Sequence, residues 1–549
     1  MRTPRYGGAG GRTSAALLAM GLFAAMAALT SGTAESVETA AGSAATPSAG
    51  ADVQRLGAVD PSGRIAARNP VLRRAPDEGN AVAHEPAAAV PLRPTMSPAS
   101  YRAAKATANN APNSAKPSVP TQPRRLVPPT AVRQFEGLNQ NESGGLRPPD
   151  TDGAHGDPAG ALNQYVEIVN SAIRVYNVNP ATPTIVSTKS LATFFGYTTT
   201  TIFDPRVMYD TTWDRWVVMA EAFPESATVQ RVFIAVSKGK NANGAYWIYS
   251  IDRGGSGAGE VFWDYGQLGM DQDALLFTAN IFPNSGGFAG AEMFCFSKAG
   301  MYNGLGVSSP VFSGLDATLA PPHVLDSNAS TYLLAAPNQT AALSLYRASN
   351  CGRSGTTLVK QANVAVPAYA VPPDAVQPGT TDRLDTIDNR FQNRSTQYGD
   401  RLWNVHTLAL GGFAAPKWYE VNTTTNSIVQ SDTFFRSGSS HDFNPSLHAR
   451  SDGSMFVSWT ATDPPAGVNA QVRYSGRLPT DPASTTNEPG NALFTSPTFY
   501  NGSSDTTERW GDYSAVVDDD STTLRRAYIV SEKINSTGVW GSRIGQIGF

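Results

Sequence analysis

One unit of sequence recurs through residues 134–549, and it limits the fold more than any other feature of the chain. Each copy opens with a polar or Pro-containing segment that leads into a short strand, continues through an Asp-rich turn and returns along an aromatic strand. Five copies are clear and two are fainter; they begin at Phe203, Trp263, Ala320, Asp442 and Arg509, and at Pro148 and Gln397. Their second strands centre on Val166, Trp216, Leu276, Leu333, Trp403, Phe456 and Tyr528, at spacings from 50 to 72 residues.

A period near 60 residues suits a four-stranded blade with generous loops. A single unit would leave its apolar faces and its edges exposed, whereas radial packing of several units buries the faces. Charged residues make up only 16% of the chain, beside 50 Gly and 39 Pro, which favours strands and turns over long helices. We therefore predict an all-β fold, a seven-bladed β-propeller, with six or eight blades or a pair of β-sandwiches as alternatives. The last strand, within residues 542–549, is expected to pair into the first blade.

The first 34 residues have the features of a signal peptide. Arg2, Arg5 and Arg12 precede an apolar run over residues 15–29, and small residues stand before a cleavage site after Ala34. The run is too short to span a bilayer comfortably, and no other stretch reaches 18 consecutive apolar residues. We predict export, cleavage near Ala34, and a secreted protein, extracellular or periplasmic, with no membrane span in its mature form.

Residues 35–133 are dominated by Ala, Pro, Ser and Thr and contain one aromatic residue, Tyr101. Such a composition cannot bury enough apolar surface to offset the entropy of ordering. We predict a disordered linker or propeptide here, with a propeptide that folds onto the mature domain as the alternative. The net charge of −3 excludes a strongly basic nucleic-acid binder, and we expect a monomer.

The innermost strands of a propeller line its central channel, so the residues leading into them are the candidates for a site. These residues are Asp150, Asp152, His155, Asp157, Asp204, Arg206, Asp264, His323, Asp400, His441, Asp442, Asn444, Glu508, Arg509, Asp512 and Tyr513. Sugar hydrolysis needs two carboxyl groups that flank the bond. Elimination from a uronate needs a base such as Tyr or His and a cation that stabilises the enolate. We predict catalytic roles for Asp204, Arg206, His323, His441, Glu508, Arg509, Asp512 and Tyr513, and substrate-binding roles for His155 and Trp510.

Structural roles compete with these assignments. An Asp or Asn before a strand commonly caps a turn, and Asp210, Asp326, Asp452 and Asp518 fit hairpin turns. Calcium at such a carboxylate turn is the one cofactor considered; no zinc motif is present, and the metal question stays open. Most tryptophans, Trp213 among them, alternate with apolar neighbours as core residues do.

The chain has two cysteines, Cys295 and Cys351. In an exported protein they predict a disulfide between adjacent blades, with two buried thiols as the alternative.

The segments PPDTDGA from Pro148, DPRVMYD from Asp204 and RWGDYS from Arg509 together resemble a group of large secreted bacterial β-propeller proteins, mostly described without a demonstrated activity. More distantly, the chain is similar to sialidase-like and other propeller glycosidases and to polysaccharide lyases. The Ser-x-Asp-x-Gly-x-Thr-Trp box of sialidases is absent, since the segment at residues 451–454 lacks the Trp ending in register. The resemblance covers residues 148–549 and implies architecture more than chemistry.

Two functions follow as expectations. The first is an extracellular enzyme that acts on a polysaccharide, by hydrolysis or β-elimination, in the central funnel. The second is a non-catalytic ring that binds a surface glycan or a protein partner. Fold alone does not choose between them.

Overall fold

The structure, a computed structural model, describes residues 57–67, 70–83, 89–114, 116, 126–157, 160–252, 261–283, 287–328, 330–338, 340–519 and 524–549. All of them belong to one unit, Val53–Phe549. The predicted signal peptide, residues 1–34, lies outside the described residues.

Most strands form antiparallel units that follow one another in chain order. The first three units are β5 (Asp152–Gly156), β6 (Gln164–Val169), β7 (Ala172–Asn177) and β8 (Thr184–Ser190); β9 (Ile202–Asp210), β10 (Arg215–Ala222), β11 (Arg231–Ser237) and β12 (Tyr246–Asp252); and β13 (Val261–Met270), β14 (Ala274–Pro283), β15 (Ala291–Ser297) and β16 (Val307–Leu315). The next comprises β18 (Ser330–Ala335), β19 (Ala342–Ser349), β20 (Thr357–Lys360) and β21 (Val364–Ala365), and is preceded by the short inner strand β17 (Pro322–Val324), which pairs with strands of the units on either side.

The remaining units are β24 (Ser395–Tyr398), β25 (Arg401–Leu410), β26 (Phe413–Asn422) and β27 (Ser427–Thr433); β28 (His441–Ala449), β29 (Met455–Asp463), β30 (Val468–Arg477) and β31 (Asn491–Thr495); and β33 (Ala515–Asp518), β34 (Arg526–Ser536) and β35 (Val539–Gly548), joined by β4 (Thr130–Asn139). A small three-stranded sheet is formed by β22 (Ala375–Val376), β23 (Arg383–Leu384) and β32 (Thr507–Glu508). Short helices are α2 (Leu191–Phe195), α3 (Lys298–Tyr302) and a 3-10 turn at Pro464–Ala466.

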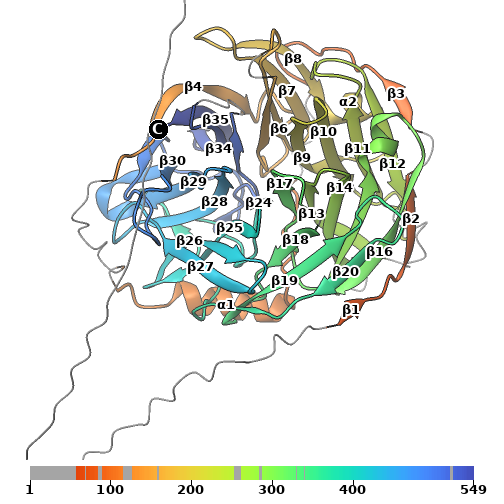
Figure 1. Ribbon diagram of the computed structural model, residues 1–549. Coiled ribbons are helices and arrows are strands. Elements are labelled where there is room, and N and C mark those ends of the chain that lie inside the picture. The colour runs from red at the N-terminus through yellow and green to blue at the C-terminus, as the bar shows by residue number, and fades with distance from the viewer. Residues whose placement is uncertain are drawn as a thin grey trace, which may run out of the picture. The chain divides into compact units, whose positions relative to one another are not determined.

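The first strand of each unit lies at the centre of the arrangement (Figure 1). These inner strands are β5, β9, β13, β17, β24, β28 and β33; each contacts the next, and β33 contacts β5. Side chains of neighbouring units pack face to face, as where Ile173 and Val175 of β7 share a core cluster with Val207 and Trp216. Because the circle closes, the inner edges of the sheets face the centre and the sheet faces bury one another.

The repeat read from the sequence is confirmed strand by strand. The seven predicted centres, Val166, Trp216, Leu276, Leu333, Trp403, Phe456 and Tyr528, all lie in second strands, namely β6, β10, β14, β18, β25, β29 and β34. The blade count stays a prediction. Short β17 pairs in parallel with both β13 and β24, so two units merge into one ten-stranded sheet.

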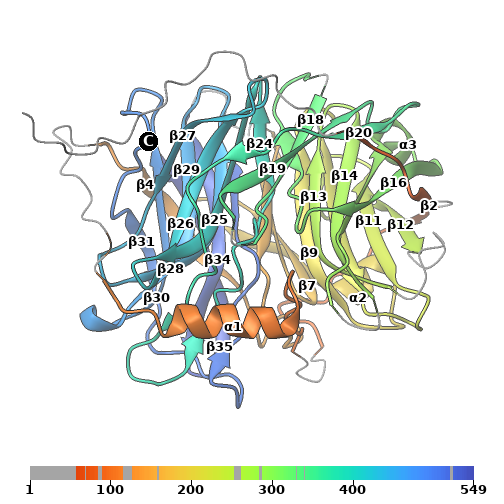
Figure 2. The ribbon, with the colours of Figure 1, turned by 90° about the horizontal axis from the view of Figure 1, so that it is seen from below.

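The prediction of disorder across residues 35–133 is wrong for much of that range. β1 (Ala58–Val59), β2 (Gly63–Ala67) and β3 (Val71–Arg73) pair with the outer strands β20, β16 and β12. α1 (Pro98–Asn109) crosses one end of the sheets (Figure 2). The prediction from composition failed because this segment does not need a core of its own. It is held by hydrogen bonds to the outer strands of other units, whose edges are available for pairing.

The predicted closure by the last strand is also corrected. β35 is the third strand of its own unit and pairs with β34, and its free edge is covered by β4, from Thr130↔Gly548 to Asn139↔Gly541. The chain before the first unit therefore supplies the outermost strand of the last one. This order joins the two ends of the repeat within a single sheet.

Cys295 and Cys351 are both buried free thiols, so the predicted disulfide is not formed in the structure. They share one apolar cluster with Leu276, Phe312 and Leu333. Hydrogen bonding with Cys295, together with burial, raises the pKa of the Cys351 thiol well above its usual value. Both groups therefore behave as small hydrophobic side chains here. Among the described residues, no helix is long and apolar enough to cross a membrane.

Candidate functional site

The residues that lead into the inner strands share an unusual backbone conformation. Asp150, Asp204, Tyr265 and Asn444 have φ values of 50°, 48°, 63° and 49°. In three of these units the pairing of the inner strand with its neighbour shifts register near this point. A bulge beside a left-handed residue turns the following side chains. The segments Asp204-Pro205-Arg206 and Asn444-Pro445-Ser446 fit ordinary turn residues in the sequence. In the structure they direct polar side chains toward the centre of the ring.

Five of the predicted catalytic residues meet in one buried cluster. The Tyr513 hydroxyl donates to Asp204 Oδ2 at 2.7 Å, and the Arg206 guanidinium stacks on the Tyr513 ring at 3.3 Å from its centroid. Arg509 donates to both carboxylate oxygens of Asp512 at 2.9 Å. The predicted convergence of Asp204, Arg206, Arg509, Asp512 and Tyr513 is thus observed.

Other polar groups that lead into the inner strands join this cluster. Asp512 N donates to Asp150 Oδ1 at 2.7 Å, and Asp264 lies 3.7 Å from Arg93 of the N-terminal segment. Burial raises the pKa of Asp264 to about 7 and that of Asp512 to about 6. The cluster also includes Glu221 from the second strand β10, which the sequence analysis did not select.

The cluster is closed to a polymeric substrate. Asp204, Arg206, Asp512 and Tyr513 are at most 5% exposed. Residues 89–114 pass over this end, where Arg93 faces Asp264. A glycosidase pair must contact its sugar, so these carboxylates have no route to one in this structure.

Five predicted residues lie outside the cluster; His155 and His323 are at the opposite end of the inner strands, and the other three are Trp510, Glu508 and His441. Trp510 is 0% exposed and packs edge-on against Phe443, so it cannot stack on a sugar from solvent, and its predicted binding role is wrong. Glu508 accepts from Ser503 N at 3.2 Å, and His441 packs against Phe413. Their surroundings are those of structural side chains.

His441 provides a test of this structural role. Burial lowers the pKa of His441 to about 3, whereas an unfolded His titrates near 6.5. Below pH 6.5 the unfolded chain takes up a proton that the folded chain does not, so stability falls as pH falls. Between pH 7 and pH 5 the free energy of unfolding of the wild type should drop by about 2 kcal/mol more than that of His441→Gln. Urea unfolding at the two pH values measures this; parallel changes in both proteins would contradict it.

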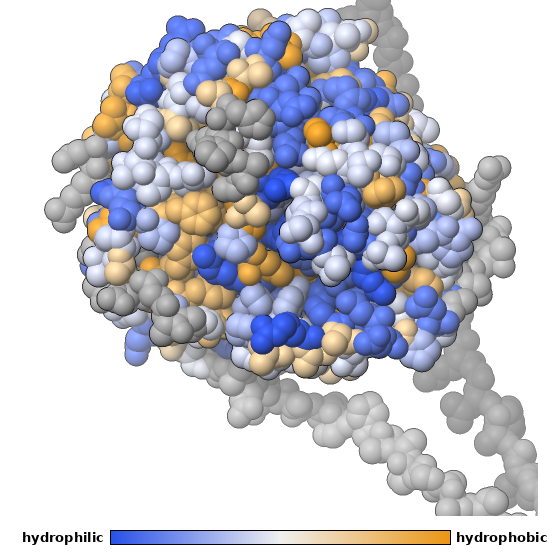
Figure 3. Space-filling model, turned by 180° about the vertical axis from the view of Figure 1, so that it is seen from behind, coloured by the Kyte–Doolittle hydropathy of each residue, from blue (hydrophilic) through white to orange (hydrophobic). Residues whose placement is uncertain are grey.

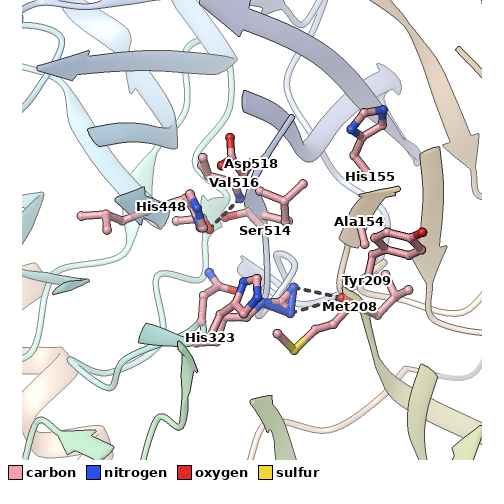
Figure 4. A pocket seen from close by; sticks show the side chains of 16 residues that line it. Ala154, His155, Met208, Tyr209, His323, His448, Ser514, Val516 and Asp518 are labelled. Carbon is pink, nitrogen blue, oxygen red and sulfur yellow. Dashed lines mark hydrogen bonds between the residues drawn. The ribbon is translucent and has the colours of Figure 1, made fainter. Parts of the chain in front are cut away.

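The opposite end of the inner strands holds a second polar group (Figure 4). His155, His323 and His448 line a central cavity of only about 30 Å³ together with Arg394, whose guanidinium is held by Asp152 at 2.8 Å. That space holds no more than a few water molecules. The predicted central funnel is therefore too narrow for a sugar at this point. His155 is also fixed, by Asn163 Oδ1 at 2.7 Å and the Asp519 carbonyl at 3.0 Å.

A larger cavity, of about 300 Å³, opens beside His323. Its polar lining comes from several turns and comprises Asp210, Thr211, Thr212, Asp271, Gln272, Lys298, Asp326 and Ser327. Lys298 is paired with Asp210 at 2.7 Å. Burial lowers the pKa of His323 to about 4, so its imidazole is neutral at neutral pH.

Two exposed aromatic residues lie close along the chain or by a hydrogen bond to residues that line this cavity, although neither lines it itself. Trp213 is 54% exposed and directly follows the lining residue Thr212 in the turn between β9 and β10. Tyr398 is 38% exposed, and the next residue, Gly399, donates its N–H to the lining residue Asp326 at 2.8 Å. Alternation with apolar neighbours predicted Trp213 to be a core residue, which its exposure contradicts, and Tyr398 was not predicted as a site residue. The sequence does contain a signal for the exposure of Trp213, because this residue lies inside an Asp-Thr-Thr-Trp-Asp turn rather than in an alternating strand.

The acidic turns considered for calcium serve local contacts. Asp452 binds Arg525 at 2.6 Å, and Asp326 accepts from Gly399. These contacts fit a structural role of turn carboxylates.

Three candidates that were selected because they lead into inner strands also have local partners. Asp157 pairs with Lys240 at 3.3 Å, Asp400 accepts from Asn422 at 2.7 Å, and Asp442 pairs with Lys116 at 2.8 Å.

An apolar pocket of about 380 Å³ lies elsewhere, lined by Leu92, Met96, Phe223, Phe262 and Phe282 among others. The view from behind shows an apolar area beside polar side chains (Figure 3). Nothing in the structure indicates what would occupy this pocket.

No protein-family model and no curated protein matches the chain. Among solved structures, the hemagglutinin-neuraminidase ectodomain of parainfluenza virus 5 is similar over 70% of this chain and 90% of that one, at 10% identity and a TM-score of 0.35. An α-L-arabinanase from Penicillium chrysogenum is similar over 76% and 99%, at 8% identity and a TM-score of 0.34. A mitotic checkpoint complex matches over 75% and 94%, at 10% identity and a TM-score of 0.33.

With TM-scores this low, and a checkpoint complex among the matches, nothing about the activity of this chain follows from these likenesses.

Proposed function

We propose that this chain is an exported seven-bladed β-propeller that binds an extracellular polysaccharide at the cavity beside His323. Export rests on the features of residues 1–34, and the blade count on the circle of inner strands with one repeat behind each. N-terminal sequencing of the mature protein tests the first point.

The exposed indole of Trp213, next to the lining residue Thr212 of a polar cavity, carries the proposal. Trp213 offers an indole face with few contacts of its own, and such faces bind the apolar faces of sugar rings. The cavity of about 300 Å³ supplies hydroxyl, amide and carboxylate groups for the sugar hydroxyls. Most of these groups lie on turns, where binding residues are commonly found.

Hydrolysis at the same cavity is the second candidate. Asp271 and Asp326 come from neighbouring turns and both line it, and one oxygen of Asp326 is buried without a hydrogen-bond partner. Two carboxylates on either side of a sugar bond are the minimum for a glycosidase. The binding role does not depend on this step.

Trp213→Ala is expected to weaken polysaccharide binding at least about tenfold, because stacking on an exposed indole is worth about 1.5 kcal/mol. Binding of a panel of neutral and uronic-acid polysaccharides is measured by calorimetry, with reducing ends and absorbance of unsaturated ends followed in the same samples. Release of sugar that is lost in Asp326→Asn but not in Trp213→Phe would establish the hydrolase.

The matched controls separate stacking from general surface effects. Trp213→Phe keeps an aromatic face and should retain most of the affinity, whereas Leu305→Ala removes an apolar side chain that is 58% exposed and is not adjacent in the chain to any residue that lines the cavity. An unchanged affinity of Trp213→Ala for every polymer that the wild type binds would refute the proposed site.

A further inference from the structure

We propose that Asp204, Glu221 and Asp264 form a site for one divalent, oxygen-preferring cation, Ca²⁺ by its size, at the end of the ring that the N-terminal segment covers. Each of the three offers a carboxylate oxygen, and these oxygens lie within 4.8 Å of one another. Two ligands on opposite sides of a Ca²⁺ ion at about 2.4 Å are separated by about 4.8 Å. The spacing therefore suits a common ion.

Unpartnered oxygens are the second observation that points to a ligand. Glu221 is 0% exposed, and neither of its carboxylate oxygens has a hydrogen-bond partner. Asp204 directs Oδ2 to the Tyr513 hydroxyl and leaves Oδ1 without a partner. A buried carboxylate without compensation is costly, so such groups are ordinarily paired or bound to a metal.

The two neighbouring guanidinium groups, of Arg206 and Arg93, do not donate hydrogen bonds to these unpartnered oxygens. Arg206 gives its donors to the carbonyls of Gly266 and Gln392 and to Asn393 Oδ1, at 3.0 to 3.2 Å. Arg93 stacks on Phe262 and reaches Asp264 only at 3.7 Å. Neither guanidinium donates a hydrogen bond to Glu221 or to Asp204 Oδ1.

The local backbone is fitted to the carboxylate of Glu221. Gly266 faces Glu221, and a Cβ at position 266 would lie 2.4 Å from Glu221 Oε1. The three carboxylates supply three oxygens without a hydrogen-bond partner, two from Glu221 and one from Asp204, beside the carboxylate of Asp264, which faces Arg93 at 3.7 Å. Ca²⁺ takes six to eight oxygen ligands, and Mg²⁺ demands a stricter octahedron.

The experiment uses the full chain, purified from calcium-containing medium. Elemental analysis by mass spectrometry should find about one calcium per chain, and prolonged EDTA treatment should remove it and lower the Tm by at least about 2 °C, which added CaCl₂ restores. Wild-type protein without calcium, with a Tm insensitive to EDTA and CaCl₂, would overturn the proposal. Retention of Mg²⁺ alone would overturn the assignment to calcium.

Two glutamine variants test whether calcium binding depends on Glu221 or on any buried carboxylate. Glu221→Gln should lose the calcium and its effect on the Tm, and in EDTA it should be at least as stable as the wild type because a buried charge is gone. Glu532→Gln is the control: Glu532 is also buried with one unpartnered oxygen, but lies outside the group of three. It should keep one calcium. If Glu221→Gln does not fold, Asp264→Asn replaces it, and the wild-type measurement stands by itself.

Discussion

Replacing Lys105 by Met is expected to lower the free energy of unfolding by about 3–5 kcal/mol. Lys105 lies on α1, and its side chain is 9% exposed. Its ammonium donates to Asp374 at 2.7 Å, to Thr386 Oγ1 at 2.8 Å and to the Pro372 carbonyl at 3.2 Å. Without the ammonium group, the carboxylate of Asp374 remains buried and has lost the cation it pairs with. Leaving such a charge uncompensated lowers the free energy of unfolding more than replacing both partners would.

The same helix supplies the control. Arg102 is exposed, so Arg102→Met should change stability by less than about 0.5 kcal/mol. Urea unfolding followed by tryptophan fluorescence measures both variants, and limited proteolysis should release α1 in Lys105→Met only. If Lys105→Met were as stable as Arg102→Met, the N-terminal segment would be a dispensable tether, as the composition of residues 35–133 suggests.

Periodicity was enough to predict the strands of the ring. Aromatic strands after Asp-rich turns mark the second strand of each unit because that strand is buried on both faces, as in β29. Edge strands leave no such pattern. β1 is two residues long and β3 is mostly exposed, so pairing with outer strands, rather than a buried face of their own, holds them in place.

The candidate site was predicted in part. Residues such as Asp204 and Asp512 do converge, because every inner strand begins at the same end of the ring. The sequence could not show that residues 89–114 cover that end, or that His323 belongs to the other. Glu221 could have been found from an acid standing alone within the apolar run Val217–Ala222.

Arg206→Met is expected to destabilise the protein by about 3–5 kcal/mol, although the sequence suggested a catalytic role for Arg206. The guanidinium is 2% exposed, makes three hydrogen bonds and stacks on Tyr513. It is also a cation that offsets the charge of Asp204 and Glu221. Arg206→Lys should recover only part of the loss, because an ammonium lacks the planar fork that serves three acceptors and a ring together.

The surface pair Arg231–Glu225, at 2.6 Å, is the matched comparison within the same sheet. Arg231→Met should cost no more than about 1 kcal/mol, since exposed ion pairs contribute little. Unfolding in urea gives the stabilities, and calorimetry with the polysaccharide gives the affinity. A folded and stable Arg206→Met protein that has lost its interaction with the polymer would show that Arg206 belongs to the binding site, and that the closed cluster opens in solution. Loss of stability with unchanged affinity in the folded fraction is the result that the buried geometry requires.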